Sequence, residues 1–173
     1  MFRQLVNIPR LFHQIRPISR NKINNTVEIG NNIIRNRFNI RSITYFTETH
    51  EFINYNEKEK TAKLGITYYA KNSLGEIIFI ENDFDVGDNV EIEDEVLTLE
   101  STKATGTLGT PIEGKIIEYN DKLIEDLEEY NNIEIENETN YWLVNLQLDE
   151  ELDTTDFLCE DEYTHFITSL DTD

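Results

Sequence analysis

Short segments that alternate apolar and polar residues, or that are rich in β-branched residues, follow one another between residues 50 and 148. Glycine, asparagine or aspartate separates them, and these residues end strands and form turns. Many short strands joined by turns predict a β-sandwich or β-barrel rather than a helical bundle. We expect strands over residues 50–55, 61–67, 76–81, 95–101, 113–119 and 140–148.

Helix signals in the same part of the chain are few. We expect a turn or two of helix over residues 68–75, closed by Gly75, and another over residues 121–130, opened by Asp121. The C-terminal residues predict two further helices that begin near Thr154 and Glu160. The buried stripe of that last segment would consist of Leu158, Tyr163, Phe166, Ile167 and Leu170.

Charge divides the chain into two unlike parts. All seven arginines lie in residues 1–41, which contain a single acid, Glu28. Residues 42–173 contain seven lysines and thirty-four acids, so their net charge is 7 − 34 = −27, against −20 for the whole chain. Phosphate binding needs clustered lysine and arginine, and we therefore expect no nucleic-acid partner.

The basic N-terminal part has the pattern of a mitochondrial transit peptide. Apolar residues recur at helical spacing through the first twenty residues, with arginines between them and no acids. We expect residues 1–41 to be the transit peptide, cleaved between Arg37 and Thr44, and residues 42–173 to be the mature domain in the mitochondrial matrix. A disordered basic tail is the alternative. No apolar run is long enough to span a bilayer, and we expect no membrane association.

Lys103 lies between two segments with strand patterns, residues 95–101 and 104–116. This arrangement places Lys103 near the tip of a β-hairpin, projecting into water. An ordinary turn lysine would occupy the same place. The sequence "ESTKA" on a hairpin, followed by "GTPIEGKI", resembles the modification site of lipoyl carrier domains, where a ligase joins lipoic acid to the lysine through an amide. Biotin carriers share the fold but normally have methionines beside the lysine, where this chain has Thr102 and Ala104.

Upstream segments make the resemblance more specific. The segments "YFTETHEF", "KLGITYYAKNSLGEIIFIE", "VGDNVE" and "NYWLVNLQL" have the order and spacing found in the glycine cleavage H-protein family, and the match covers residues 45–170. The resemblance implies a mainly β fold, the hybrid barrel-sandwich of lipoyl and biotinyl carriers, with short peripheral and C-terminal helices. It implies covalently attached lipoic acid on Lys103.

The resemblance implies a monomeric carrier rather than an enzyme, with no catalytic residue and no metal. Its partners would be a pyridoxal-phosphate glycine decarboxylase, an aminomethyltransferase, dihydrolipoamide dehydrogenase and the lipoyl ligase or transferase. The chemistry belongs to the lipoyl group and to these enzymes, between which the carrier moves the aminomethyl group of glycine.

The family holds the loaded arm in a surface cleft, and its cleft segment matches Thr49, His50 and Glu51. The resemblance makes Glu51 the partner of the cargo's ammonium group. A second acid that the family places four residues beyond the lysine is replaced by Thr107. From the residues alone, His50 is better explained as structural than as catalytic, and Glu51 equally well as a solvated strand acid.

Other positions depart from the family pattern or stand apart from it. Phe52 replaces a usual tryptophan, Tyr68 replaces a usual aspartate, and "NETNY" replaces a glycine-containing turn before Trp142. We expect Trp142 to anchor the core and the lone Cys159 to be a buried small residue.

Two other functions stay open. An H-like carrier would relay lipoyl groups to other enzymes without carrying the aminomethyl group, and the departures above leave that reading in place. A biotinyl or 2-oxo-acid-dehydrogenase carrier is disfavoured, because the upstream segments do not fit it and no catalytic or subunit-binding domain accompanies the hairpin.

Overall fold

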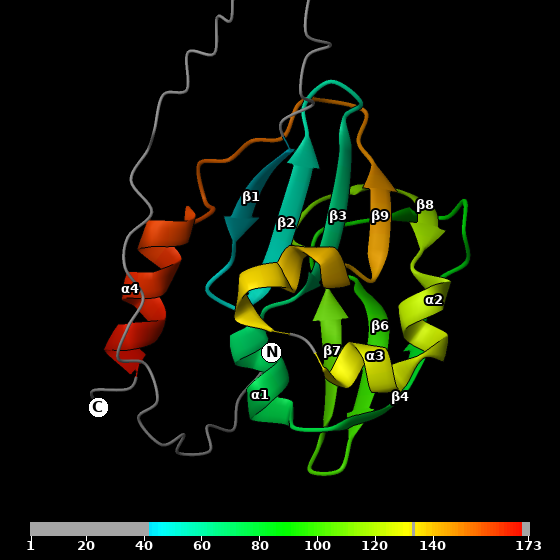
Figure 1. The fold of residues 1–173 in the computed structure, drawn as a ribbon. Coiled ribbons are helices and arrows are strands. Elements are labelled where there is room, and N and C mark those ends of the chain that lie inside the picture. Colours follow the sequence, from blue (N-terminus) through cyan, green and yellow to red (C-terminus); the bar gives the residue numbers. More distant parts are fainter. Residues whose placement is uncertain (1–41, 133, 171–173) are drawn as a thin grey trace, which may run out of the picture.

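The structure, a computed structural model, describes residues 42–132 and 134–170, and it consists mainly of two antiparallel sheets (Figure 1). The six-stranded sheet contains, in spatial order, β1 (Ser42–Phe46), β2 (Glu51–Asn56), β3 (Thr61–Ile66), β9 (Val144–Gln147), β8 (Gly114–Tyr119) and β5 (Asn89–Val90). The three-stranded sheet contains β4 (Ile77–Asn82), β6 (Glu95–Ser101) and β7 (Thr105–Gly109). The predicted mainly β fold is confirmed, and its two sheets form an open sandwich rather than a closed barrel.

The core lies between the sheets because each strand directs alternate side chains inward. Leu64 on β3 and Leu146 on β9 belong to the same buried cluster as Leu99 on β6 and Leu108 on β7, and all four are fully buried. Burial of a side chain of this size contributes about 1.5–3 kcal/mol. The alternation that predicts these strands from the sequence is therefore also what joins the two sheets.

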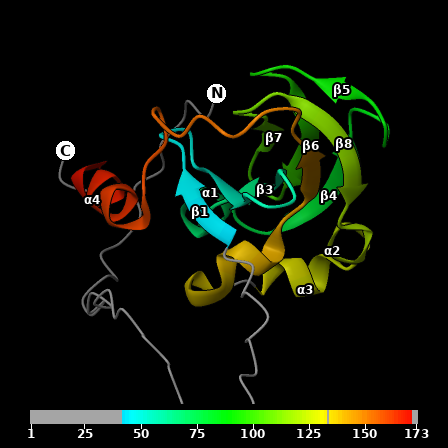
Figure 2. The same cartoon turned by 90° about the horizontal axis from the view of Figure 1, so that it is seen from above.

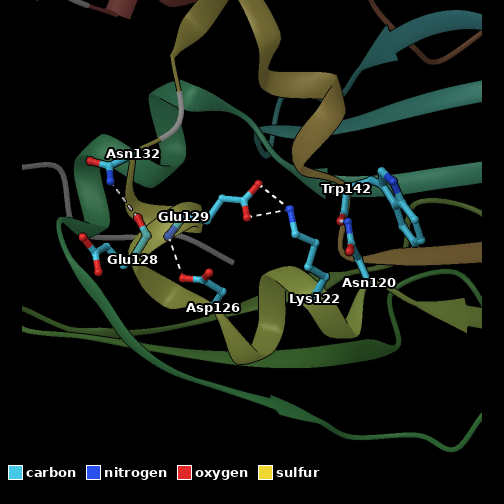
Figure 3. A network of polar contacts seen from close by, with 7 residues as sticks. All are labelled: Asn120, Lys122, Asp126, Glu128, Glu129, Asn132 and Trp142. Carbon is cyan, nitrogen blue, oxygen red and sulfur yellow. Dashed lines mark hydrogen bonds and ion pairs between the residues drawn. The ribbon is translucent and has the colours of Figure 1, made fainter.

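Short helices lie around the sheets: α1 (Tyr68–Leu74), α2 (Asp121–Glu125), α3 (Leu127–Asn131), the 3-10 helix η1 (Ile135–Tyr141) and α4 (Glu160–Leu170). The single helical segment expected over residues 121–130 is two helices, broken at Asp126, whose side chain caps α3 by accepting from the Glu129 N–H at 3.0 Å. Figure 3 shows the ion pair that joins the two helices, with the Lys122 ammonium 2.7 Å from the Glu129 carboxylate.

Two expected elements differ from those observed, and the observed strands include ones that were not expected. The strand expected over residues 140–148 begins only at Val144, because η1 occupies the residues before it. The helix expected near Thr154 is absent from the described structure, where the chain instead bridges to β1 through Phe46 and Leu158. β1 was not expected as a strand, and it pairs along its whole length with β2, from Ser42 opposite Asn56 onward.

Helix α4 lies beside β1 (Figures 1 and 2), and a second, smaller apolar cluster holds it there. Phe46, Phe52 and Tyr163 are buried in it, and the Phe46 and Tyr163 rings stack with centroids 4.7 Å apart. The partly buried residues around them are Trp142, Leu158, Phe166 and Ile167. The expected apolar stripe of α4 is therefore present except for Leu170, which is exposed.

Two residue predictions are wrong in this region. Trp142 is only partly buried and contacts the small cluster instead of anchoring the main core, with the Lys63 ammonium 4.2 Å from its ring centroid. Cys159 is exposed rather than buried, because it precedes the first turn of α4.

The expected transit peptide lies outside the described residues. No helix in the described part of the chain is long and apolar enough to cross a membrane.

Candidate functional site

The turn between β6 and β7 is fixed by the side chain of Ser101. Its hydroxyl oxygen accepts from the backbone N–H of Lys103 at 3.1 Å and of Ala104 at 3.0 Å, and it donates to the Ala104 carbonyl at 2.8 Å. The Ser101 N–H donates to the same carbonyl at 2.9 Å. A serine that satisfies this many backbone groups holds a tight turn in one conformation. The serine of "ESTKA" therefore has a structural role, because it holds the turn that carries Lys103.

Lys103 is exposed on this turn, and its side chain passes over the C-terminal end of α1. The backbone of Gly75, which ends α1, has φ +88°, and a Cβ added there would lie 3.2 Å from the Lys103 Cε. The Thr102 N–H donates to the Glu76 carbonyl at 3.0 Å, which ties the turn to the same segment. The hairpin tip is thus braced against the segment after α1, and the lysine stem lies along a surface that only glycine leaves open.

The loop before β2 holds Glu51 in a buried position. The Thr47 hydroxyl donates to its Oε2, and the Thr49 hydroxyl donates to the same atom at 2.5 Å. The Glu51 N–H donates to the Thr47 hydroxyl oxygen at 2.9 Å. Glu51 is only 5% exposed, so its interpretation as a solvated strand acid is wrong. Its carboxylate belongs to a threonine-lined loop.

His50 joins this loop to the C-terminal helix. Its Nδ1 lies 2.8 Å from the Tyr163 hydroxyl, which in turn lies 2.8 Å from the Thr67 hydroxyl. Burial lowers the pKa of His50 from 6.5 to about 4, so its imidazole is neutral at pH 7. Burial also raises the pKa of Tyr163. These contacts support the structural reading of His50.

Helix α1 connects the two ends of this site. Its N-cap is Thr67, whose N–H donates to the His50 carbonyl at 2.9 Å, and its C-terminal end is Gly75 beneath Lys103. A helix of seven residues is about 10 Å long. Helix α1 therefore lies between the Lys103 turn and the loop that contains Glu51.

Thr107 lies on a different element from that loop. It is half-buried on β7 opposite Thr98, in the three-stranded sheet, and its neighbours Gly106 and Leu108 are the residues that face the core. Within the described residues Thr107 makes no hydrogen bond to the loop of residues 47–51. The structure therefore joins Thr49, His50 and Glu51, and within the described residues no hydrogen bond links Thr107 to them.

Thr47 and Thr67 were not singled out from the sequence, and Tyr163 was expected only as part of the apolar stripe of the C-terminal helix. Thr67 had a detectable signal, since a threonine directly before a helical segment is a common N-cap. Thr47 had none, and neither had the contact of Tyr163 with His50, because the two residues are 113 positions apart and nothing in one sequence pairs residues so far apart. Within the described residues no group of three or more histidine, cysteine or acidic side chains is placed to hold a metal ion.

Two departures from the family pattern, Phe52 and Tyr68, lie near the loop. Phe52 is accommodated by packing, and Tyr68 is accompanied by the acid Glu138. Phe52 is fully buried against Gly65, where an added Cβ would lie 2.7 Å from the phenyl ring. The backbone N–H of Tyr68, at the start of α1, donates to the Glu138 carboxylate at 2.7 Å. Burial raises the pKa of Glu138, and this backbone hydrogen bond opposes the shift. Glu138 thus supplies an acceptor at the helix start.

Comparison with known proteins gives a consistent result. The sequence matches the family described as "Glycine cleavage H-protein" over residues 44–170. A glycine cleavage system H protein of Thermotoga maritima is 32% identical over 121 residues, which cover 70% of this chain and 93% of that protein. The glycine cleavage system H protein of Dinoroseobacter shibae is 34% identical over 124 residues, which cover 72% of this chain and 97% of that protein.

A solved structure agrees with the sequence matches. The crystal structure of a glycine cleavage system H protein from Mycobacterium marinum superposes with a TM-score of 0.61 at 25% identity, covering 75% of this chain and 99% of the other. The family match spans the residues of both the Lys103 hairpin and the Thr49–Glu51 loop. The chain belongs to the glycine cleavage H-protein family.

Proposed function

We propose that this chain carries lipoic acid on Lys103 and moves the aminomethyl group of glycine among the enzymes of the glycine cleavage system. Family membership gives it the role of a lipoyl carrier in glycine cleavage. The observation that supports Lys103 as the attachment point is its exposed position on a turn that Ser101 fixes. When attached, the lipoyl group supplies the disulfide and dithiol chemistry.

The surroundings of Lys103 fit acylation. Its ammonium makes no hydrogen bond or ion pair with any described residue, so no partner has to be broken before the amine reacts. The turn backbone is held by Ser101, so modification of the side chain leaves its hydrogen bonds in place. Tethering to a rigid turn raises the effective concentration of the arm at a docked partner.

The chain acts as a carrier subunit, and its partners supply the catalysis. Glycine decarboxylase, aminomethyltransferase and dihydrolipoamide dehydrogenase would each take the arm in turn, and a ligase or transferase would attach it. The protein would work as a monomer in the mitochondrial matrix after removal of residues 1–41. Isolation of the mature protein from mitochondria with an N-terminus near Ser42 tests this location, and a cytosolic chain that begins at Met1 contradicts it.

We assign Glu51 to the cargo. The loaded arm brings an ammonium group to a carboxylate that Thr47 and Thr49 already orient, and a charge-assisted hydrogen bond there would protect it from water. Thr107 lacks the charge that would supply a second contact. His50 and Thr49 shape the loop around the carboxylate.

The alternative function is a lipoyl relay that passes lipoyl groups to other enzymes without carrying the aminomethyl group. Two observations favour it. Two threonine hydroxyls already donate hydrogen bonds to the Glu51 carboxylate, and Thr107 is neutral. A glycine–bicarbonate exchange assay with the matching decarboxylase separates the two functions. Exchange supports the glycine cleavage carrier, and a lipoylated protein without exchange supports the relay.

The attachment is tested with Lys103→Arg. Arginine keeps the positive charge, but the ligase cannot acylate it in the same way. Wild-type protein made with lipoate should gain one lipoyl mass on the peptide that contains Lys103, and the variant should gain none and lose carrier activity. Lys122→Arg, at an exposed lysine on α2, is the control and should be lipoylated like the wild type. A lipoyl group on the Lys103→Arg chain would contradict the assignment.

A further inference from the structure

Strand β4 exposes two consecutive apolar side chains. Ile77 and Ile80 are buried, whereas Ile78 is 53% exposed and Phe79 is 47% exposed. Regular alternation would turn one of the middle pair inward, but the pairing of β4 with β6 shifts between Ile77 and Phe79. A β-bulge of this kind places an extra residue outside the ladder and redirects side chains. We call Ile78 and Phe79 the bulge patch.

The bulge patch lies directly beside the lysine turn. Phe79 is opposite Glu100 on β6, and Ile77 is opposite Ser101, the residue that fixes the turn. The Thr102 N–H donates to the Glu76 carbonyl, just before β4 begins. Because β4 is the edge strand of its sheet, the patch is not covered by another strand in the described structure. A protein that reaches the turn from this side meets both exposed side chains.

Negative charge surrounds the bulge patch. Glu76, Glu81 and Glu100 are exposed around it, and neither β4 nor β6 contains a lysine or arginine. Exposed apolar side chains rimmed by polar groups are typical of protein interaction sites. The complementary partner surface is an apolar pocket ringed by lysines or arginines, whose charge also speeds the encounter with so acidic a chain.

We propose that the bulge patch is the docking site for the enzyme that attaches the lipoyl group to Lys103. The unmodified chain offers no arm to hold, so an attaching enzyme must recognise protein surface beside the lysine. Enzymes that act later also bind the arm itself. In the attachment step the uncharged Lys103 amine attacks the carbonyl of lipoyl adenylate, an amide forms, and AMP leaves as the amine loses a proton. This inference depends on the proposed function of Lys103.

The test compares two double variants of the full-length chain. Ile78→Thr/Phe79→Thr removes the apolar surface but keeps residues that favour strands. Ile92→Thr/Ile117→Thr removes exposed apolar side chains outside β4 and is the matched control; Ile92 is 60% exposed and Ile117 is 38% exposed. Initial rates of lipoylation by a lipoate–protein ligase, supplied with lipoate and ATP, are followed by intact mass at several carrier concentrations.

We expect kcat/KM for the bulge-patch variant to fall at least about tenfold, as loss of a central interface contact does. At saturating carrier the rate should approach that of the wild type, because the amine and its turn are unchanged. The control should match the wild type. Circular dichroism and urea unfolding verify that both variants are folded, and Phe79→Tyr, which keeps the ring, should retain most of kcat/KM.

Other outcomes separate the possible failures. An unchanged kcat/KM in the folded bulge-patch variant, or an equal loss in the control, overturns the docking site. Self-association of the wild type that the bulge-patch variant abolishes, with lipoylation unaffected, would assign the patch to a second copy of the chain and also overturn it. Failure of the ligase to modify Lys103 in the wild type would instead contradict the proposed function.

Discussion

At the scale of single residues, His50 has an unusual backbone conformation for a reason that its contacts supply. Its φ of +73° lies in the left-handed region, which costs a residue with a side chain on the order of 1 kcal/mol. In this conformation the imidazole lies against the Tyr69 ring, with centroids 4.6 Å apart, and bonds to Tyr163. The conformation therefore directs the ring toward Tyr163 on α4.

His50 should make the stability of the fold depend on pH. Its folded pKa of about 4 lies below the ordinary 6.5, so between these values the unfolded chain binds a proton that the folded chain does not. Stability should fall as pH drops below 6.5, by about 1 kcal/mol between pH 7 and pH 5 after allowance for solvent screening of this half-buried group. His50→Asn, which tolerates positive φ, should flatten this part of the curve of urea unfolding against pH. An unchanged slope would contradict the prediction.

Gly75 should be hard to replace. Gly75→Ala places a Cβ in a left-handed conformation and against the stem of Lys103, and we expect a loss of about 1–2 kcal/mol in the free energy of unfolding. Gly109→Ala is the control, since the nearest atom to its added Cβ is 4.0 Å away. Urea denaturation of both measures the difference. Equal stability of the two variants would mean that the positive φ carries no cost here.

Residues differ in how far the sequence predicts them, and the difference lies in the range of their contacts. Lys103 and Ser101 are predictable because the turn depends on neighbours within three positions. The burial of Glu51 is not predictable, although Thr47 and Thr49 lie within four positions of it, because burial depends on the segments that pack around β2. Cys159 is mispredicted, because its exposure depends on where α4 begins, and helix ends are the least certain feature of a sequence pattern.

At the scale of elements, Tyr163 holds α4 in place, because its ring stacks on Phe46 and its hydroxyl forms hydrogen bonds. Tyr163→Phe keeps the stack on Phe46 but leaves His50 and Thr67 without the phenol hydroxyl between them. We expect a loss of about 1–2 kcal/mol in stability, because buried polar groups lose their partner. Urea unfolding measures the loss, and hydrogen exchange should show earlier opening of α4.

A second variant on the same helix provides the control for Tyr163→Phe. Thr164→Ala removes an exposed hydroxyl that bonds within α4, and such surface changes usually stay within about 0.5 kcal/mol. If both variants are equally destabilised, the effect comes from helix propensity and not from the contacts of Tyr163.

Elements with strong alternation are predicted well, and elements that depend on distant partners are not. β6 matches its expected range because "EVLTLES" alternates and turns follow it. β1 has only five residues, and its identity as a strand comes from pairing with β2. The region before Trp142 looks extended, but it forms η1, whose Glu138 accepts from the start of α1. The split between α2 and α3 follows from Asp126, which serves as C-cap of one helix and N-cap of the next.

At the scale of the whole molecule, acidic side chains greatly outnumber the ion pairs that could offset their charge. The chain has a formal charge of −20, and the described residues contain one ion pair, Lys122 with Glu129. Self-repulsion of like charges destabilises a compact state. The acidic surface therefore carries a cost in stability.

Salt should accordingly stabilise this fold. Raising ionic strength from about 0.01 M to about 0.1 M shortens the Debye length from about 30 Å to about 10 Å and screens the repulsion. We expect Tm to rise by about 3–5 °C, the shift that about 1 kcal/mol produces in a domain of this size. Calorimetry of the full chain measures it. A fall in Tm would show that attractive contacts dominate instead.

Helix α1 sets a fixed length between Gly75, which lies beneath the stem of Lys103, and the loop joined to Thr67. Each residue added to such a helix would lengthen it by about 1.5 Å and turn its end by about 100°. An insertion would therefore move Gly75, and the Glu76 carbonyl that accepts from the Thr102 N–H, relative to the Lys103 turn. The position of that turn relative to the loop at Thr67 thus depends on the length of α1 as well as on the β6–β7 hairpin.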